Sequence, residues 1–246
     1  MAKSTPRAPV SGPTFIRLLA RLTDVEVPQT QPVLSEQLSQ WIDWTRAVAL
    51  SRALDGAPVA EEGAPGSDAV DDEECARARA ALVQSITRDP TLATTRQREE
   101  VSVAGDAPRA EKPVDFSIYR ERHLSFQRAM LSATGRLRGR LRDRLAASST
   151  DLARLAEVDA VMEQTLSPRE QRLLASIPTL LGDHFERLRQ AAQATPDDGS
   201  AAQEIPTHLP GAWLDVFRQD MQNVLLAELD VRFQPVDGLL AALRTR

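Results

Sequence analysis

The sequence predicts an all-α fold: an extended helical bundle of long amphipathic helices with a disordered acidic linker. Two observations predict it. Apolar residues recur at three- and four-residue steps over 116–145 and again over 211–233, in a chain whose aromatic content is only 4%. Such steps place side chains on one face of a helix, here in a stripe about 120° wide. A long one-sided helix must bury that face within a bundle or on a partner.

Four segments follow one another along the chain. They are a disordered leader at 1–12, an N-terminal helical pair at 13–55, a flexible acidic and polar linker at 56–114, and a C-terminal helical bundle at 115–246. In the helical pair, Thr14 is the expected N-cap of a short first helix, and a second helix is expected from about Val33 to Leu54. Trp41 and Trp44 are expected to be core anchors of this second helix.

The linker is strongly acidic at its start. Residues 55–74 hold eight acidic and no basic residues, which leaves too little apolar surface to offset chain entropy. The segment is therefore predicted to be a mobile tether, with the alternative that it folds back on a basic surface. A short helix is expected near 73–88, ended by Asp89-Pro90.

The C-terminal bundle begins with a long helix at about 115–147, for which Asp115 is the expected N-cap. Ser167-Pro168-Arg169-Glu170 has the pattern of a capping box with proline at the first helical position, so it predicts a helix start. Pro178 predicts a kink in the helix that follows. Gln234-Pro235 is expected to end the last long helix.

An arginine run is the most conspicuous charged feature, and it comprises Arg136, Arg138, Arg140, Arg142 and Arg144. Three interpretations remain open. The run can be a solvated face with partners four residues away, a docking site for an acidic protein surface or the acidic tether, or a contact for phosphate groups. Gly135 and Gly139, within the same helix, favour either a close helix approach or bend, or a tolerated weak spot.

An apolar stripe, which we call the core stripe, begins before these arginines in the sequence and continues among them. Its members are Phe126, Met130, Leu137, Leu141 and Leu145. The pattern is compatible with either a buried core or an interface with another chain.

Catalytic and cofactor motifs are not recognisable in the sequence. His123, His184 and His208 lack the spacing of a metal site, and we predict no metal, no cofactor and no enzymatic activity. A buried pair of His184 with Glu228 would form a pH-sensitive polar contact. Cys75 follows two glutamates, whose charge raises rather than lowers a thiol pKa.

Composition bounds the setting of the protein. The net charge of −5 argues against a globally basic nucleic-acid binder. The single cysteine is typical of a reducing compartment. Neither a secretory signal nor an apolar run long enough to span a bilayer is found, so a soluble cytoplasmic protein is expected.

The N-terminal residues carry a family resemblance. The family resemblance is carried by Phe15-Ile16-Arg17-Leu18-Leu19-Ala20-Arg21-Leu22-Thr23-Asp24 and by Leu38-Ser39-Gln40-Trp41-Ile42-Asp43-Trp44. These segments resemble an uncharacterised proteobacterial family, a domain of unknown function, and the similarity extends through the arginine-rich helix to the C-terminus. The resemblance implies a genomic setting near motor-stator-like membrane proteins and envelope proteins of the OmpA type. It assigns no activity and no functional residues.

Two functional hypotheses follow. The first is a non-enzymatic cytoplasmic adaptor or assembly protein that acts through helix–helix contacts with a protein partner or with itself, accessory to a membrane or envelope complex. The second is a regulator that binds nucleic acid or another anionic ligand through the arginine run. No direct membrane insertion is expected. The identity of any partner and the oligomeric state do not follow from the sequence.

Overall fold

The computed structural model describes residues 14–23, 34–56, 68–94, 115–194 and 211–245. Every regular element in these ranges is an α-helix, which confirms the predicted fold class. The helices are α1 (Thr14–Thr23), α2 (Leu34–Trp41), α3 (Trp44–Asp55), α4 (Asp68–Thr87), α6 (Phe116–Ala146), α7 (Thr150–Leu174), α8 (Ile177–Ala194) and α9 (Ala212–Arg244). The predicted leader at 1–12 and most of the acidic tether lie outside the described residues.

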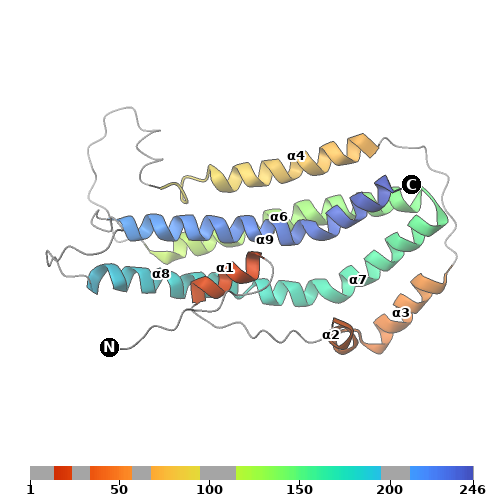
Figure 1. Ribbon diagram of the computed structural model, residues 1–246, viewed down its shortest axis with the longest axis horizontal. Helices are drawn as coiled ribbons and strands as arrows, with labels where there is room; N and C mark the ends of the chain where they lie inside the picture. The colour runs from red at the N-terminus through yellow and green to blue at the C-terminus, as the bar shows by residue number, and fades with distance from the viewer. Residues whose placement is uncertain (1–13, 24–33, 57–67, 95–114, 195–210, 246) are drawn as a thin grey trace, which may run out of the picture.

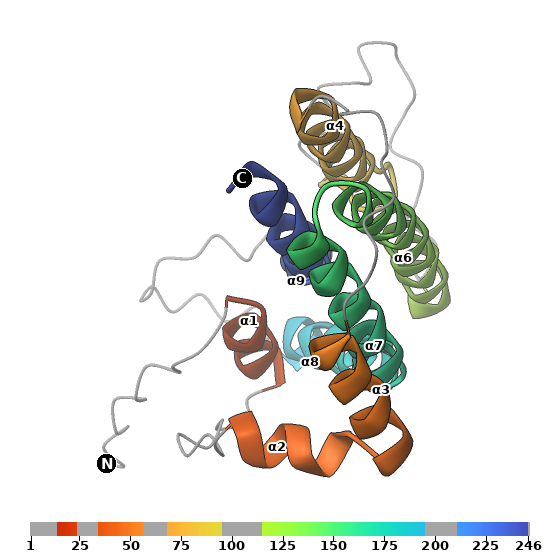
Figure 2. The same ribbon diagram turned by 90° about the vertical axis from the view of Figure 1, so that its right-hand side faces the viewer.

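Helix α9 forms the centre of the bundle. It runs along the long axis beside α4 and α6, with α7 and α8 following one another along its other side (Figure 1). Helix α1 packs on α8 and α9, whereas α3 rests on α7. Viewed along the bundle, α2 and α3 project from the side opposite α4 (Figure 2). We call residues 34–56 the α2–α3 arm.

Helix α6 forms as the apolar pattern predicts. Asp115 caps it by accepting a hydrogen bond from the Ser117 backbone N–H at 3.2 Å, and the helix ends at Ala146. Eight of its residues are buried at three- and four-residue steps, and they include Tyr119, His123 and all five members of the core stripe. The stripe packs into the main core together with the buried face of α9.

The helix start predicted at 167–170 is wrong. Helix α7 continues through Pro168, and the break comes later, at 175–176. Proline removes only one backbone hydrogen bond, here to the carbonyl of the exposed Gln164, which water can satisfy. Packing of Thr165 and Leu174, both buried, holds the helix together across this point. Pro178 causes no kink, because it lies in the first turn of α8, where a missing N–H costs nothing.

Two further helix boundaries differ from expectation. Helix α9 passes through Pro235, since Phe233 and Val236 on either side are buried in the core. The helix expected at 33–54 is divided into α2 and α3, because the Asp43 side chain accepts from the Arg46 backbone N–H at 2.8 Å and starts a new helix.

The predicted tryptophan anchors and the predicted linker helix also need correction. Trp44 is 83% exposed, so it is not a core anchor. Trp41 is half-buried, with the Arg169 guanidinium 4.3 Å from its ring centroid. Helix α4 begins at Asp68, five residues before the predicted start at 73, so the last part of the acidic segment is helical.

Candidate interaction surfaces

The arginine run is largely engaged inside the protein. Arg138 donates to Asp159 through Nη2 at 2.6 Å and Nε at 2.8 Å, and Arg142 donates to Glu163 at 2.6 Å. Both acids belong to α7, so these pairs tie α6 to α7. Burial acts to lower the Arg138 guanidinium pKa, but the hydrogen bonds to Asp159 and the charges of Asp159 and Glu163 together outweigh it and raise this pKa. Arg138 and Arg142 therefore pair with acids of another helix and not with residues four positions away on α6, which the sequence suggested.

The other side of the run contacts the acidic start of α4. Arg140 pairs with Glu74, and Arg144 Nε lies 3.1 Å from Asp71 Oδ2. Asp71 and Glu74 belong to the segment that the sequence predicted to be a mobile tether, and both contact the arginine run. Arg136 is exposed and donates to the Ser132 hydroxyl at 3.3 Å, which leaves most of its guanidinium open to solvent.

The core stripe offers no free surface. Phe126, Met130, Leu137, Leu141 and Leu145 are each 4% exposed or less. They contact other helices of the same chain, chiefly α9. An interface with another protein must therefore use residues outside this stripe.

A polar cluster lies in the core between α6 and α9. It consists of His123, Gln127, Glu228 and Arg232. Arg232 donates to Glu228 Oε1 through Nε at 2.9 Å and Nη2 at 2.8 Å, and Gln127 Nε2 lies 3.0 Å from the same oxygen. The predicted His184–Glu228 pair is wrong. His184 Nε2 instead lies 2.9 Å from Oδ2 of Asp220, which precedes Glu228 by about two helical turns in α9.

His123 is the unsatisfied member of the polar cluster. It is fully buried, its ring nitrogens have no hydrogen-bond partner, and Nε2 is 3.7 Å from Glu228 Oε2. Burial, followed by the nearby Arg232 charge, lowers the His123 pKa from 6.5 to about 4, so the imidazole is neutral near pH 7. Burial also raises the Glu228 pKa, although Arg232 and Gln127 oppose this.

Above the polar cluster, an open groove of about 440 Å³ runs between α6 and α7, which we call the α6–α7 groove. Its walls are Leu124, Gln127, Arg128 and Leu131 of α6, Gln171, Leu174 and Ala175 at the end of α7, and Arg232 of α9. Leu124 and Leu131 are 36% and 44% exposed, so the groove presents apolar surface to solvent. Nothing in the sequence pattern marked it, because its residues come from three helices.

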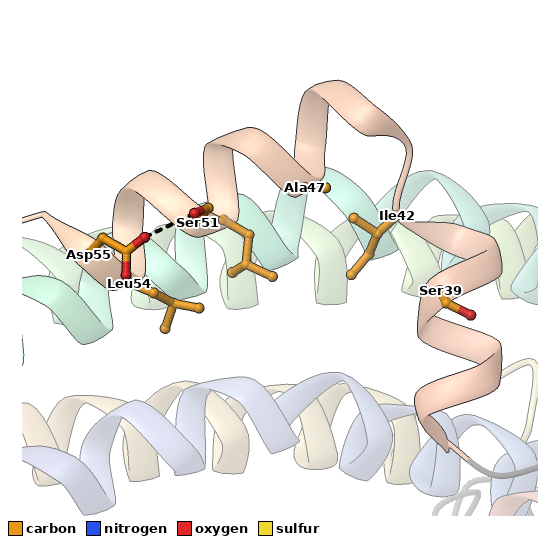
Figure 3. Close-up of a pocket in the computed structure, with 7 residues that line it drawn as sticks. Ser39, Ile42, Ala47, Ser51, Leu54 and Asp55 are labelled. Carbon is orange, nitrogen blue, oxygen red and sulfur yellow. Dashed lines mark hydrogen bonds between the residues drawn. The ribbon is translucent and has the colours of Figure 1, made fainter.

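A second groove of about 480 Å³ follows the inner side of the α2–α3 arm, which we call the α2–α3 groove. Its lining is mostly apolar: Ile42, Ala47, Leu50 and Leu54, with Ser39, Ser51 and Asp55. Figure 3 shows Ile42 and Leu54 projecting to the same side of the arm, with Asp55 at one end. The Asp55 carboxylate accepts a hydrogen bond from Ser51 at 3.0 Å. Leu54 is 53% exposed.

Other kinds of site find little support in the described ranges. They contain no cluster of His, Cys, Asp and Glu suited to a metal ion. Within the same ranges no helix combines the length and apolarity needed to cross a membrane. Cys75 is buried, and burial followed by Asp71 and Glu74 raises its thiol pKa, which makes it a poor nucleophile.

Comparison with known proteins identifies the family. A family described as "Protein of unknown function (DUF3348)" matches residues 1–245. The chain belongs to this family. Its match spans the arm, the linker and the bundle, in agreement with the resemblance that the N-terminal residues carry. No curated protein and no solved structure is significantly similar to the chain.

Proposed function

We propose that this DUF3348 protein is a non-enzymatic adaptor or assembly protein that binds a helical protein partner in the α2–α3 groove. The observation that carries the proposal is an apolar groove on an arm that rests on the bundle chiefly through α3 and α7, beside an 83% exposed Trp44. Exposed tryptophans and contiguous apolar surface are typical of protein interfaces.

The arm is held in place, which favours binding without a large ordering cost. Arg154 of α7 donates through Nη2 to the Gly56 carbonyl at 3.1 Å, where α3 ends. Arg169 of α7 stacks on Trp41. Because these contacts fix the arm on the bundle, the arm presents the groove in a defined shape.

We infer that the partner is an amphipathic helix whose leucine-like side chains enter between Ile42, Leu50 and Leu54. A lysine or arginine on that helix would meet Asp55 at the end of the groove. The cytoplasmic setting and the role beside a membrane or envelope complex belong to the same proposal, and they rest on the cysteine content and the family resemblance.

The test starts with affinity capture at native expression, followed by purification of the captured partner and titration calorimetry. We expect Leu50→Asp combined with Leu54→Asp to weaken binding at least tenfold. The matched control is Leu173→Asp, which changes an exposed leucine of α7 outside the groove and should leave Kd unchanged. Equal binding by the double variant and the wild type would contradict the proposal.

The alternative of an anion-binding regulator has less support, because Arg138, Arg142, Arg140 and Arg144 pair with acids of this chain. It makes a distinct prediction. Retention on heparin or DNA that falls steeply with salt, and that is lost when the run is changed to glutamine, would favour it over the adaptor.

A further inference from the structure

The α6–α7 groove combines features of a small-molecule site that the adaptor role does not use. Its volume of about 440 Å³ is within the range of ligand pockets, about 300–1,000 Å³. Leu124, Leu131 and Leu174 supply apolar walls on one side of the polar cluster. A site with apolar walls and a few buried polar groups fits an amphiphilic ligand.

The polar cluster beneath the groove is costly to maintain. Glu228 is fully buried and Arg232 is 8% exposed, and replacing such an ion pair by apolar side chains often leaves stability unchanged or increases it. The bundle therefore gains little stability from these charges. Their position at the floor of an open groove is accounted for if one of them also meets a ligand.

Arg232 retains a donor for that purpose. Its Nε and Nη2 both donate to Glu228, whereas Nη1 has only Glu170 Oε1 at 3.6 Å, beyond hydrogen-bond distance. The Glu170 side chain is 41% exposed, so it can move aside. Arg128, at the rim, uses Nε on the Leu124 carbonyl and is otherwise exposed.

The charge of the lining selects the ligand. Two arginines and no acid are among the eight residues that line the groove. We propose that the α6–α7 groove binds a single-chain carboxylate, with its head group on Arg232 and Arg128 and its alkyl chain along Leu124, Leu131 and Leu174. A guanidinium binds a carboxylate through paired, charge-assisted hydrogen bonds.

Titration calorimetry of the full chain tests this with decanoate, decanol and decyltrimethylammonium as probes, each below its aggregation concentration. We expect decanoate to bind at least tenfold more tightly than decanol, and the cationic probe to bind most weakly. Equal affinities for decanoate and decanol would overturn the proposal, because the groove would then be an unspecific apolar surface.

Matched pairs of variants on α6 test whether the probes bind in the α6–α7 groove. Arg128→Gln should weaken decanoate and spare decanol, whereas Arg120→Gln, an exposed arginine outside the groove, should change neither. Leu131→Asn should weaken both probes about tenfold, and Ile118→Asn, which is also exposed on α6 but outside the groove, should not. The same loss in Ile118→Asn as in Leu131→Asn would overturn the assignment.

The head-group contact has its own test. Glu228→Met with Arg232→Met removes both buried charges together, so neither is left unpaired, and thermal unfolding verifies that the variant folds. Its decanoate affinity should fall to that of decanol. An unchanged preference for decanoate in the folded variant would overturn the role of Arg232, and if the variant does not fold, the Arg128→Gln result decides.

Discussion

Helix α9 and helix α3 show two ways in which one chain uses a helix. In α9, 15 of 33 residues are buried, and the helix contacts α1, α4, α6, α7 and α8. In α3, one of 12 residues is buried, and the helix rests on α7. Apolar residues occur in both, so the difference lies in what covers them. Apolar side chains hold the bundle together in α9, whereas in the α2–α3 arm Trp44 and Leu54 remain exposed.

Matched leucine truncations give the largest expected contrast between the two regions. Leu141 of α6, which packs in the core around α9, is 2% exposed and Leu54 is 53% exposed. We expect Leu141→Ala to lower the free energy of unfolding by about 2–5 kcal/mol and Leu54→Ala by less than about 0.5 kcal/mol. Urea unfolding followed by circular dichroism measures both. Similar losses would mean that the arm is part of the core.

Acid should weaken the bundle through His123. Because its pKa is lowered in the folded state, the unfolded chain binds more protons between about pH 4 and 6.5, and stability falls as pH decreases through that interval. The full effect is about 3 kcal/mol. Glu228, with its raised pKa, acts in the opposite direction, because the folded state binds its proton more readily than the unfolded chain.

Substitution of His123 separates these contributions. His123→Leu should flatten the dependence of unfolding free energy on pH between 4 and 6.5. It should also increase stability at pH 7 by about 1–2 kcal/mol, because two unsatisfied ring nitrogens are removed. Denaturant unfolding at several pH values gives both results, and an unchanged slope would show that His123 is not the titrating group.

The ion pairs around α6 should differ in strength with their exposure. Asp159 is 13% exposed and faces Arg138 and Arg142, whereas Glu74 and Arg140 are 37% and 52% exposed. We expect Asp159→Asn to cost about 2 kcal/mol and Glu74→Gln less than about 1 kcal/mol. Double-mutant cycles with Arg138 and Arg140 measure the two coupling energies. A stronger Glu74–Arg140 coupling would reverse this ranking of the two sides of α6.

Glycine substitutions give the smallest effects and distinguish the open surface from the packed end of the bundle. A Cβ added at Gly135 or Gly139 meets nothing within 4 Å, so each change to alanine should stabilise by about 0.5–1 kcal/mol. At Gly182 a Cβ would lie 3.0 Å from the Phe116 ring, and alanine should destabilise. Thermal unfolding of the three variants tests these signs. The open space around a Cβ at Gly135 and Gly139 also excludes a close helix approach there by any of the described residues.

The sequence predicted the helices better than their ends. The period of apolar residues gave α6 almost to the residue, because burial in a bundle follows that period directly. Prolines misled at Pro168 and Pro235, where packing on both sides outweighs one lost backbone bond. Asp43 was overlooked as a cap within an apparently continuous helix.

The candidate sites were less predictable, for a physical reason. Both grooves and the polar cluster depend on which helices are neighbours, and no spacing along one helix contains that information. Arg138 finds Asp159 on α7, and His184 finds Asp220 rather than Glu228, because of how α6, α7, α8 and α9 pack. What the sequence did carry was the Arg232–Glu228 spacing of four residues, which is a common ion-pair spacing on a helix.

The central position of α9 has a consequence for biosynthesis. Until residues 212–244 have left the ribosome, α1, α4, α6, α7 and α8 lack the helix that each of them contacts. Until α9 is available, the nascent chain exposes the apolar faces of these helices, a state prone to aggregation. The bundle can complete its core only after α9 has been synthesised.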